Sequence, residues 1–114
     1  MKVGETITVD RRALNNYAGV FYFSHDVMLC FAALLTGANR GMIWHTANQA
    51  AVHLSSMGFA GTALAKQLEQ IKAECDPAIA ADLSEDRRFE LAAEVFRLSR
   101  AVGQILEHVA KMPG

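Results

Sequence analysis

Residues 84–110 read SEDRRFELAAEVFRLSRAVGQILEHVA, and this stretch decides the fold class. Aliphatic residues recur in it at alternating spacings of four and three, which places them on one stripe of an α-helix. Ser84 is a suitable N-cap, because its hydroxyl accepts hydrogen bonds from the free amide groups of a first helical turn. The predicted inner residues of this helix are Leu91, Val95, Leu98, Val102, Ile105 and Val109.

Upstream of this stretch, the same spacing predicts three more main helices, over residues 10–36, 40–57 and about 62–75. A short helix is predicted from Asp76-Pro77 to about residue 83, because proline is favoured at a first helical position. The predicted buried faces of the second and third helices consist of Ile43, Ala47, Ala50, Leu54 and Met57, and of Leu64, Leu68, Ile71 and Cys75.

Short connections between sequential helices favour antiparallel neighbours, so the sequence predicts an all-α, up-and-down helical bundle of four main helices plus a short one. A chain of 114 residues makes one domain, here residues 1–114. Residues 1–9 contain β-formers and are predicted to be a short extended arm, and residues 112–114 a frayed tail.

Composition excludes several classes of protein. Charged residues are 20% of the chain and its net charge is −1. A nucleic-acid-binding protein normally carries an excess of basic residues, so the sequence argues against this class. Ser24, His25 and Asp26 interrupt the apolar stretch, so no segment is long enough to span a membrane. Cys30 and Cys75 make no disulfide framework or metal motif, which favours the cytoplasm and predicts neither a metal site nor a cofactor.

Charged side chains are almost absent from the first half of the chain. Between Ala13 and Ala65 only Asp26 and Arg40 are charged. The second half of the first helix is apolar all round, and the outer face of the second helix is uncharged, which is typical of an interface core. The sequence therefore predicts a soluble homodimer that acts as a non-enzymatic interaction or regulatory module. The predicted interface residues are Phe21, Phe23, Met28, Phe31, Leu35 and Trp44.

The alternative is a small-ligand-binding protein or enzyme with a pocket between the first two main helices. Asp26 lies among apolar residues, where a carboxylate is either functional or paired with Arg40 or a hydroxyl; a break near Ser24 would instead make it an N-cap. His45 and His53 line one flank of their helix, ~12 Å apart, too far to share one metal ion. The residues predicted to line this pocket are Tyr22, His25, Asp26, Trp44 and His45.

Overall fold

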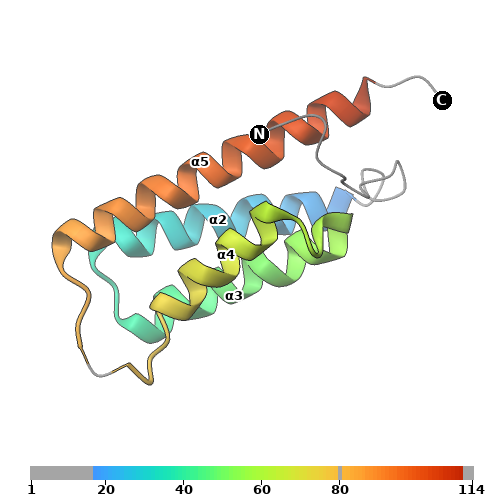
Figure 1. Cartoon of the computed structure of the whole chain (residues 1–114). Coiled ribbons are helices and arrows are strands. Elements are labelled where there is room, and N and C mark those ends of the chain that lie inside the picture. Colours follow the sequence, from blue (N-terminus) through green and yellow to red (C-terminus); the bar gives the residue numbers. More distant parts are fainter. Residues whose placement is uncertain (1–16, 80, 112–114) are drawn as a thin grey trace.

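The computed structural model describes residues 17–79 and 81–111, and this part of the chain folds into four α-helices joined by short connections (Figure 1). The predicted extended arm, the helix start at Asp10 and the tail after residue 111 lie outside the described residues. The helices are α2 (Tyr17–Thr36), α3 (Arg40–Leu54), α4 (Ala63–Glu74) and α5 (Glu85–Ala110).

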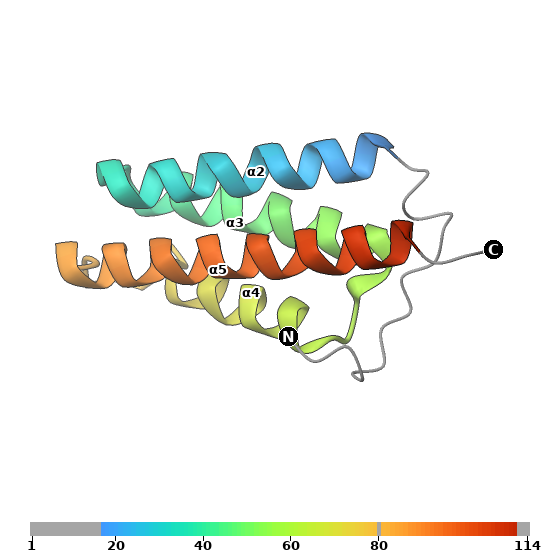
Figure 2. The ribbon, with the colours of Figure 1, turned by 90° about the horizontal axis from the view of Figure 1, so that it is seen from above.

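Each helix runs antiparallel to the one before it, so the bundle has up-and-down topology, as the sequence predicts (Figure 1). Helix α2 packs against both α3 and α5, while α4 packs against α3 and, more sparsely, against α5. In Figure 2, α2 and α5 lie side by side over their length. None of the described helices combines enough length with enough apolar sequence to cross a lipid bilayer.

Three predicted helix starts are confirmed by side-chain capping. Asn39, Thr62 and Ser84 each accept a hydrogen bond from the backbone N–H three residues further on, over 2.8, 3.2 and 3.1 Å. Each cap satisfies an amide that has no partner within its own helix. Gly37 ends α2 with φ of 72°, a left-handed conformation that glycine adopts without a steric penalty.

The core lies along the bundle axis and contains the predicted inner residues of the second and third helices and most of those of α5. Phe59 is fully buried as well, although it follows the predicted end of the second helix. The largest fully buried side chains are Phe59, Leu34, Ile43, Leu54, Met57, Leu68, Leu91, Leu98, Val95 and Val102.

Helix α2 is one continuous helix, so the predicted alternative of a break near Ser24 is wrong. It points one apolar side into the core and leaves the other side exposed. The buried side holds Phe23, Val27, Cys30, Ala33 and Leu34.

The second helix is shorter than predicted, because α3 ends at Leu54 and one wide π-helical turn, η1 (Ser55–Phe59), follows it. Gly58, with φ of 94°, turns the chain out of the helix there. The wide turn accommodates Met57 and Phe59 in the core together, and both are almost completely buried.

The predicted short helix at 76–83 is wrong for the residues that the structure describes there. Asp76 instead closes a turn: its Oδ1 accepts from the N–H of Ala78 over 2.8 Å, and its carbonyl accepts from Ile79. Ile79 remains 43% exposed. A helix of this length needs an apolar face packed on the protein, and the segment buries too little to stabilise one.

The four helices have unequal lengths. Helix α4 has 12 residues and α5 has 26, which correspond to roughly 18 and 39 Å of helix axis. The C-terminal turns of α5 therefore extend beyond the start of α4 (Figure 2). In these turns Ile105 and Val109 are only partly buried, whereas Val102 is completely buried.

Candidate functional site

Asp26 is the one acidic residue in α2, and it lies in the middle of the helix. Its Oδ2 is 2.7 Å from Nδ1 of His53, near the end of α3. The Asp26 side chain is 14% exposed and that of His53 is 26% exposed. This contact joins the two helices and gives the mostly buried carboxylate a partner, which such a group requires. The predicted pairing of Asp26 with Arg40 or a hydroxyl is therefore wrong.

Aromatic rings surround this pair. The Tyr22 ring stacks on His53, with 5.4 Å between ring centroids, and Phe21 meets Tyr22 edge to face at 5.7 Å. His25, which is 57% exposed, stacks on Phe21 and has its Nδ1 3.8 Å from Oδ1 of Asp26. We call these five residues, Phe21, Tyr22, His25, Asp26 and His53, the Asp26 cluster.

The Asp26 cluster holds one imidazole in a defined orientation. A carboxylate accepts hydrogen bonds, so Nδ1 of His53 carries the proton in this contact and Nε2 is the nitrogen left for other partners. An oriented imidazole of this kind can bind a ligand or move a proton at Nε2. No group of three potential ligands suited to a metal ion occurs among the described residues.

The structure brings together three of the five residues predicted to line a ligand pocket: Tyr22, His25 and Asp26. It does not bring the other two to them. His45 is exposed two turns before His53 on α3, about 12 Å along the helix axis. Trp44 is partly buried and packs against the core.

Two members of the Asp26 cluster were not predicted to line the pocket: Phe21 was assigned to the interface, and His53 was assigned to no site. The positions of Asp26 and His53 relative to the turn at residues 37–39 could have identified His53 as the partner. Helices α2 and α3 form an antiparallel pair about this turn. Asp26 lies 10 residues before the end of α2 and His53 lies 13 residues after the start of α3. Positions at similar distances from such a turn face each other at similar heights.

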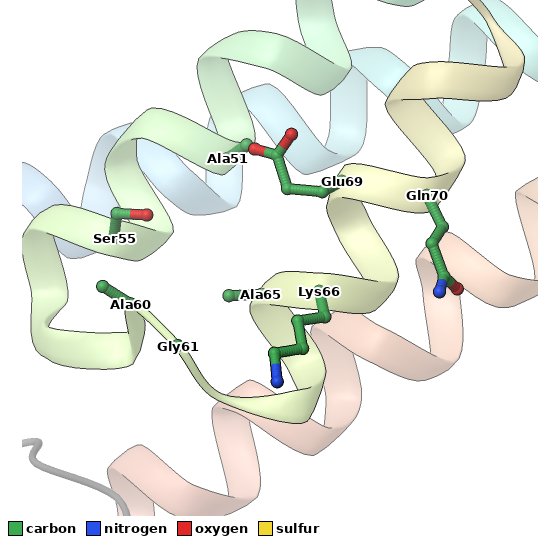
Figure 3. Close-up of a pocket in the computed structure, with 8 residues that line it drawn as sticks. All are labelled: Ala51, Ser55, Ala60, Gly61, Ala65, Lys66, Glu69 and Gln70. Atoms are coloured by element: carbon green, nitrogen blue, oxygen red, sulfur yellow. The ribbon is translucent and has the colours of Figure 1, made fainter.

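A pocket of about 420 Å³ lies elsewhere, between the end of α3 and the start of α4 (Figure 3). Lys66 and Glu69 extend from α4 on either side of Ala65, and Glu69 is ion-paired with Lys72. The site is wide and mostly lined by small side chains. Its lining residues are Ala51, Ser55, Ala60, Gly61, Ala65, Lys66, Glu69 and Gln70.

The exposed side of α2 carries a stripe of apolar residues. Phe21, Met28 and Leu35 are 64%, 71% and 42% exposed and stand seven residues apart. We call this stripe the α2 face. Of the other predicted interface residues, Phe23 is buried within the chain, whereas Phe31 and Trp44 are partly buried against its core.

The α2 face continues onto α5. The rings of Phe31 and Phe96 have centroids 6.1 Å apart, and Phe96 is 51% exposed. Phe89 is 44% exposed and stands seven residues before Phe96, so it lies on the same side of α5. The neighbouring sides of the two helices thus expose large apolar groups together.

A bidentate ion pair lies at the C-terminal end of α4. Arg87 of α5 donates from Nε and Nη2 to the two carboxylate oxygens of Glu74, the latter over 2.6 Å. The hydrogen bond from Arg87 lowers the pKa of the Glu74 carboxyl. This bidentate pair fixes the end of α4 against the start of α5.

Both cysteines are free and buried. Burial raises the pKa of Cys75 to about 11, and the nearby Cys30 contributes to the same shift. Burial also raises the pKa of Cys30, against a smaller opposing effect of the Thr46 side chain. These thiols therefore stay protonated and act as small apolar core groups.

Comparison of the chain with models of known protein families, with curated proteins and with solved structures finds no match.

Proposed function

We propose that this protein works by binding, as an interaction module that assembles as a homodimer through the α2 face. The observation that carries the proposal is the seven-residue spacing of Phe21, Met28 and Leu35, all exposed on one side of a 20-residue helix. Large apolar groups at this spacing form a helix-packing seam. The two free buried thiols suit the reducing cytoplasm, where we propose that the dimer acts.

The charge distribution favours a second copy as the occupant of this seam. Asp26 is the only charged residue of α2, and it is already paired with His53. The α2 face thus offers no charge for a charged partner to match, whereas an identical uncharged face complements it. Symmetric dimers of identical chains are also the commonest oligomers.

The spacing also fixes the symmetry of the proposed dimer. Phe21 and Leu35 are equally far from Met28 along the helix. If two copies of α2 cross antiparallel about a two-fold axis at Met28, Phe21 of each copy faces Leu35 of the other. Phe89 and Phe96 then extend the contact from α2 onto α5, beside the axis.

Sedimentation equilibrium tests the oligomeric state. We expect twice the mass of one chain at micromolar concentration, and an unfolding midpoint that rises with protein concentration. Met28→Glu places a charge in the seam and should yield monomers. Ile79→Glu, an equally apolar exposed residue outside the seam, should leave the dimer intact. Wild-type protein that sediments as a monomer at every accessible concentration would rule the homodimer out.

Oxidative cross-linking tests the face. Met28→Cys puts a thiol beside its own copy at the proposed axis, so mild oxidation should give covalent dimers, whereas Ile79→Cys should not. The native cysteines are buried and do not interfere. A protein that sediments as a dimer while Met28→Cys remains unlinked assembles through another surface, and the α2 face is then rejected.

A second candidate function is binding or proton transfer at the Asp26 cluster, favoured by the 2.7 Å contact between Asp26 and His53. Thermal melts of Asp26→Asn at neutral pH separate this function from a structural role. A structural pair should lose about 1–3 kcal/mol on substitution, since the hydrogen bond is to a charged group. A cluster shaped for a ligand should give an equal or higher midpoint. Asp82→Asn, at an exposed loop residue, is the control.

A further inference from the structure

A pocket of about 360 Å³ lies where α2 ends, α3 begins and the segment before α5 passes. The turn at Gly37, the first turn of α3 and the loop residues Asp82 and Leu83 form its walls, and Arg88 of α5 completes it. In Figure 1 the connection between α2 and α3 and the start of α5 lie at the same end of the bundle. This pocket is separate from both the Asp26 cluster and the α2 face.

Two arginines line the pocket, and one of them has unused donors. Nε and Nη1 of Arg40 are buried and have no hydrogen-bond partner. A buried charged donor without an acceptor is costly, so this guanidinium lacks the compensation that an anion beside it would supply. Arg88 uses Nη1 to donate to the Leu34 carbonyl over 2.7 Å, which leaves the rest of its guanidinium for another acceptor.

No carboxylate forms an ion pair with either of these arginines in the part of the chain that the structure describes: neither Arg40 nor Arg88 has an acidic oxygen within 4 Å. The carboxylate of Glu74 is paired with Arg87, and the charge of Arg40 makes only a smaller contribution to the lowered pKa of Glu74. Asp82 lines the pocket but is not ion-paired there. The lining of the pocket therefore has two positive side chains, Arg40 and Arg88, against one negative side chain, Asp82.

The position of Arg40 adds to this excess. It is the first residue of α3, where the helix dipole presents its positive end and where a cation is unfavourable. The first turn of α3 has no acidic residue, whereas the first turn of α5 has Glu85 and Asp86. An anion in the pocket would compensate the dipole and the two arginines together.

We propose that this pocket binds the phosphate group of a small phosphorylated molecule. A guanidinium presents paired N–H donors that match the oxygens of a phosphate, which makes arginine the residue suited to this recognition. The volume exceeds that of the phosphate group alone. Ile43 and Leu83 provide apolar wall for the organic part, and Asp82 provides an acceptor for a hydroxyl.

Thermal melts with inorganic phosphate and with glycerol phosphate, at ionic strength held constant with sodium chloride, test the proposal. Both ligands should raise the melting midpoint of the wild type. Arg40→Gln should weaken binding about tenfold, because it removes the charged donor. Arg97→Gln, at an exposed arginine of α5 outside the pocket, should bind as the wild type does.

A second variant, which should bind phosphate more tightly, distinguishes a loss of binding from a failure of the protein to fold. Asp82→Asn removes the negative charge from the pocket wall at an exposed residue, and it should bind phosphate more tightly than the wild type. No shift of the wild-type midpoint with either ligand would overturn the proposal. Equal shifts in the wild type and in Arg40→Gln would overturn it as well, since binding would then lie elsewhere.

Discussion

Cys30 and Cys75 are core groups whose chemistry is suppressed by their surroundings. Both are almost completely buried, and burial raises the pKa of Cys75 to about 11 from an ordinary 9.0. At pH 8 its thiolate is therefore about a hundredfold rarer than that of an ordinary cysteine. We predict that neither thiol reacts with a disulfide reagent at pH 8 until the protein unfolds.

The exposed thiol of Ile79→Cys, which lies outside the α2 face, supplies the reference rate for this measurement. It should react promptly in the native protein, while the two native thiols should react at the rate of unfolding or when denaturant is added. Native thiols that label as fast as the introduced one would show that the core around them opens readily. The same variant is the control of the cross-linking experiment, which depends on unreactive native cysteines.

Asp26 shows which residue-scale features the sequence can predict. Its position among apolar neighbours predicted a carboxylate that is either functional or paired with Arg40 or a hydroxyl; the side chain is 14% exposed and contacts His53 instead. The identity of the partner was not predictable from local sequence. His53 reaches Asp26 through the alignment of α2 against α3, which depends on the geometry of the turn at residues 37–39 and on packing in the core.

Helix α5 contributes buried residues to the core from Leu91 to Val102. Leu98 is buried at its centre, 1% exposed. We predict that Leu98→Ala lowers the free energy of unfolding by about 3 kcal/mol, because it loses transfer energy and leaves a cavity. Arg97→Ala, at the exposed residue next to it, should change stability by less than about 0.5 kcal/mol. Urea unfolding that gives similar losses for the two variants would contradict the packing described.

The periodic pattern predicted the buried faces of α3 and α4 and most of that of α5, but it did not decide which side of α2 is buried. In α4 and α5 charged residues mark the side toward water, and the predicted inner residues of α4 and most of those of α5 are buried. Helix α2 has apolar residues on both sides, so its own sequence does not distinguish Phe23 from Phe21. Contacts with α3 and α5 decide that Phe23 lies inside. The wide turn at Ser55–Phe59 likewise depends on what Met57 and Phe59 pack against.

At the scale of the whole molecule, acid should weaken the fold through the pair that fastens α4 to α5. Arg87 lowers the pKa of Glu74 in the folded protein below its ordinary 4.5. The stabilisation is therefore present above the unfolded-state pKa, and it is lost as pH falls through the lower folded-state pKa. We predict that loss of this pair in acid lowers the free energy of unfolding by up to about 0.5 kcal/mol. The effect is small because both side chains are more than a third exposed to solvent.

Urea unfolding at pH 5 and at pH 3 measures this loss. The difference in stability between the two pH values should be smaller in Glu74→Gln than in the wild type. Arg87→Gln should reduce it by a similar amount, and the double variant should reduce it no further, because the two substitutions remove one interaction. An unchanged pH dependence in Glu74→Gln would show that the pair contributes nothing in solution.

The unequal lengths of α4 and α5 imply that the molecule does not open as a single cooperative unit. Where α4 runs beside α5, an amide of α5 exchanges its hydrogen with water only if several helices separate together. Beyond the start of α4, the turns around Ile105 and Val109 have fewer neighbours and bury less of their surface. Those turns can unwind and reform while the rest of the bundle stays closed, so a single helix spans a slowly exchanging segment and a rapidly exchanging one.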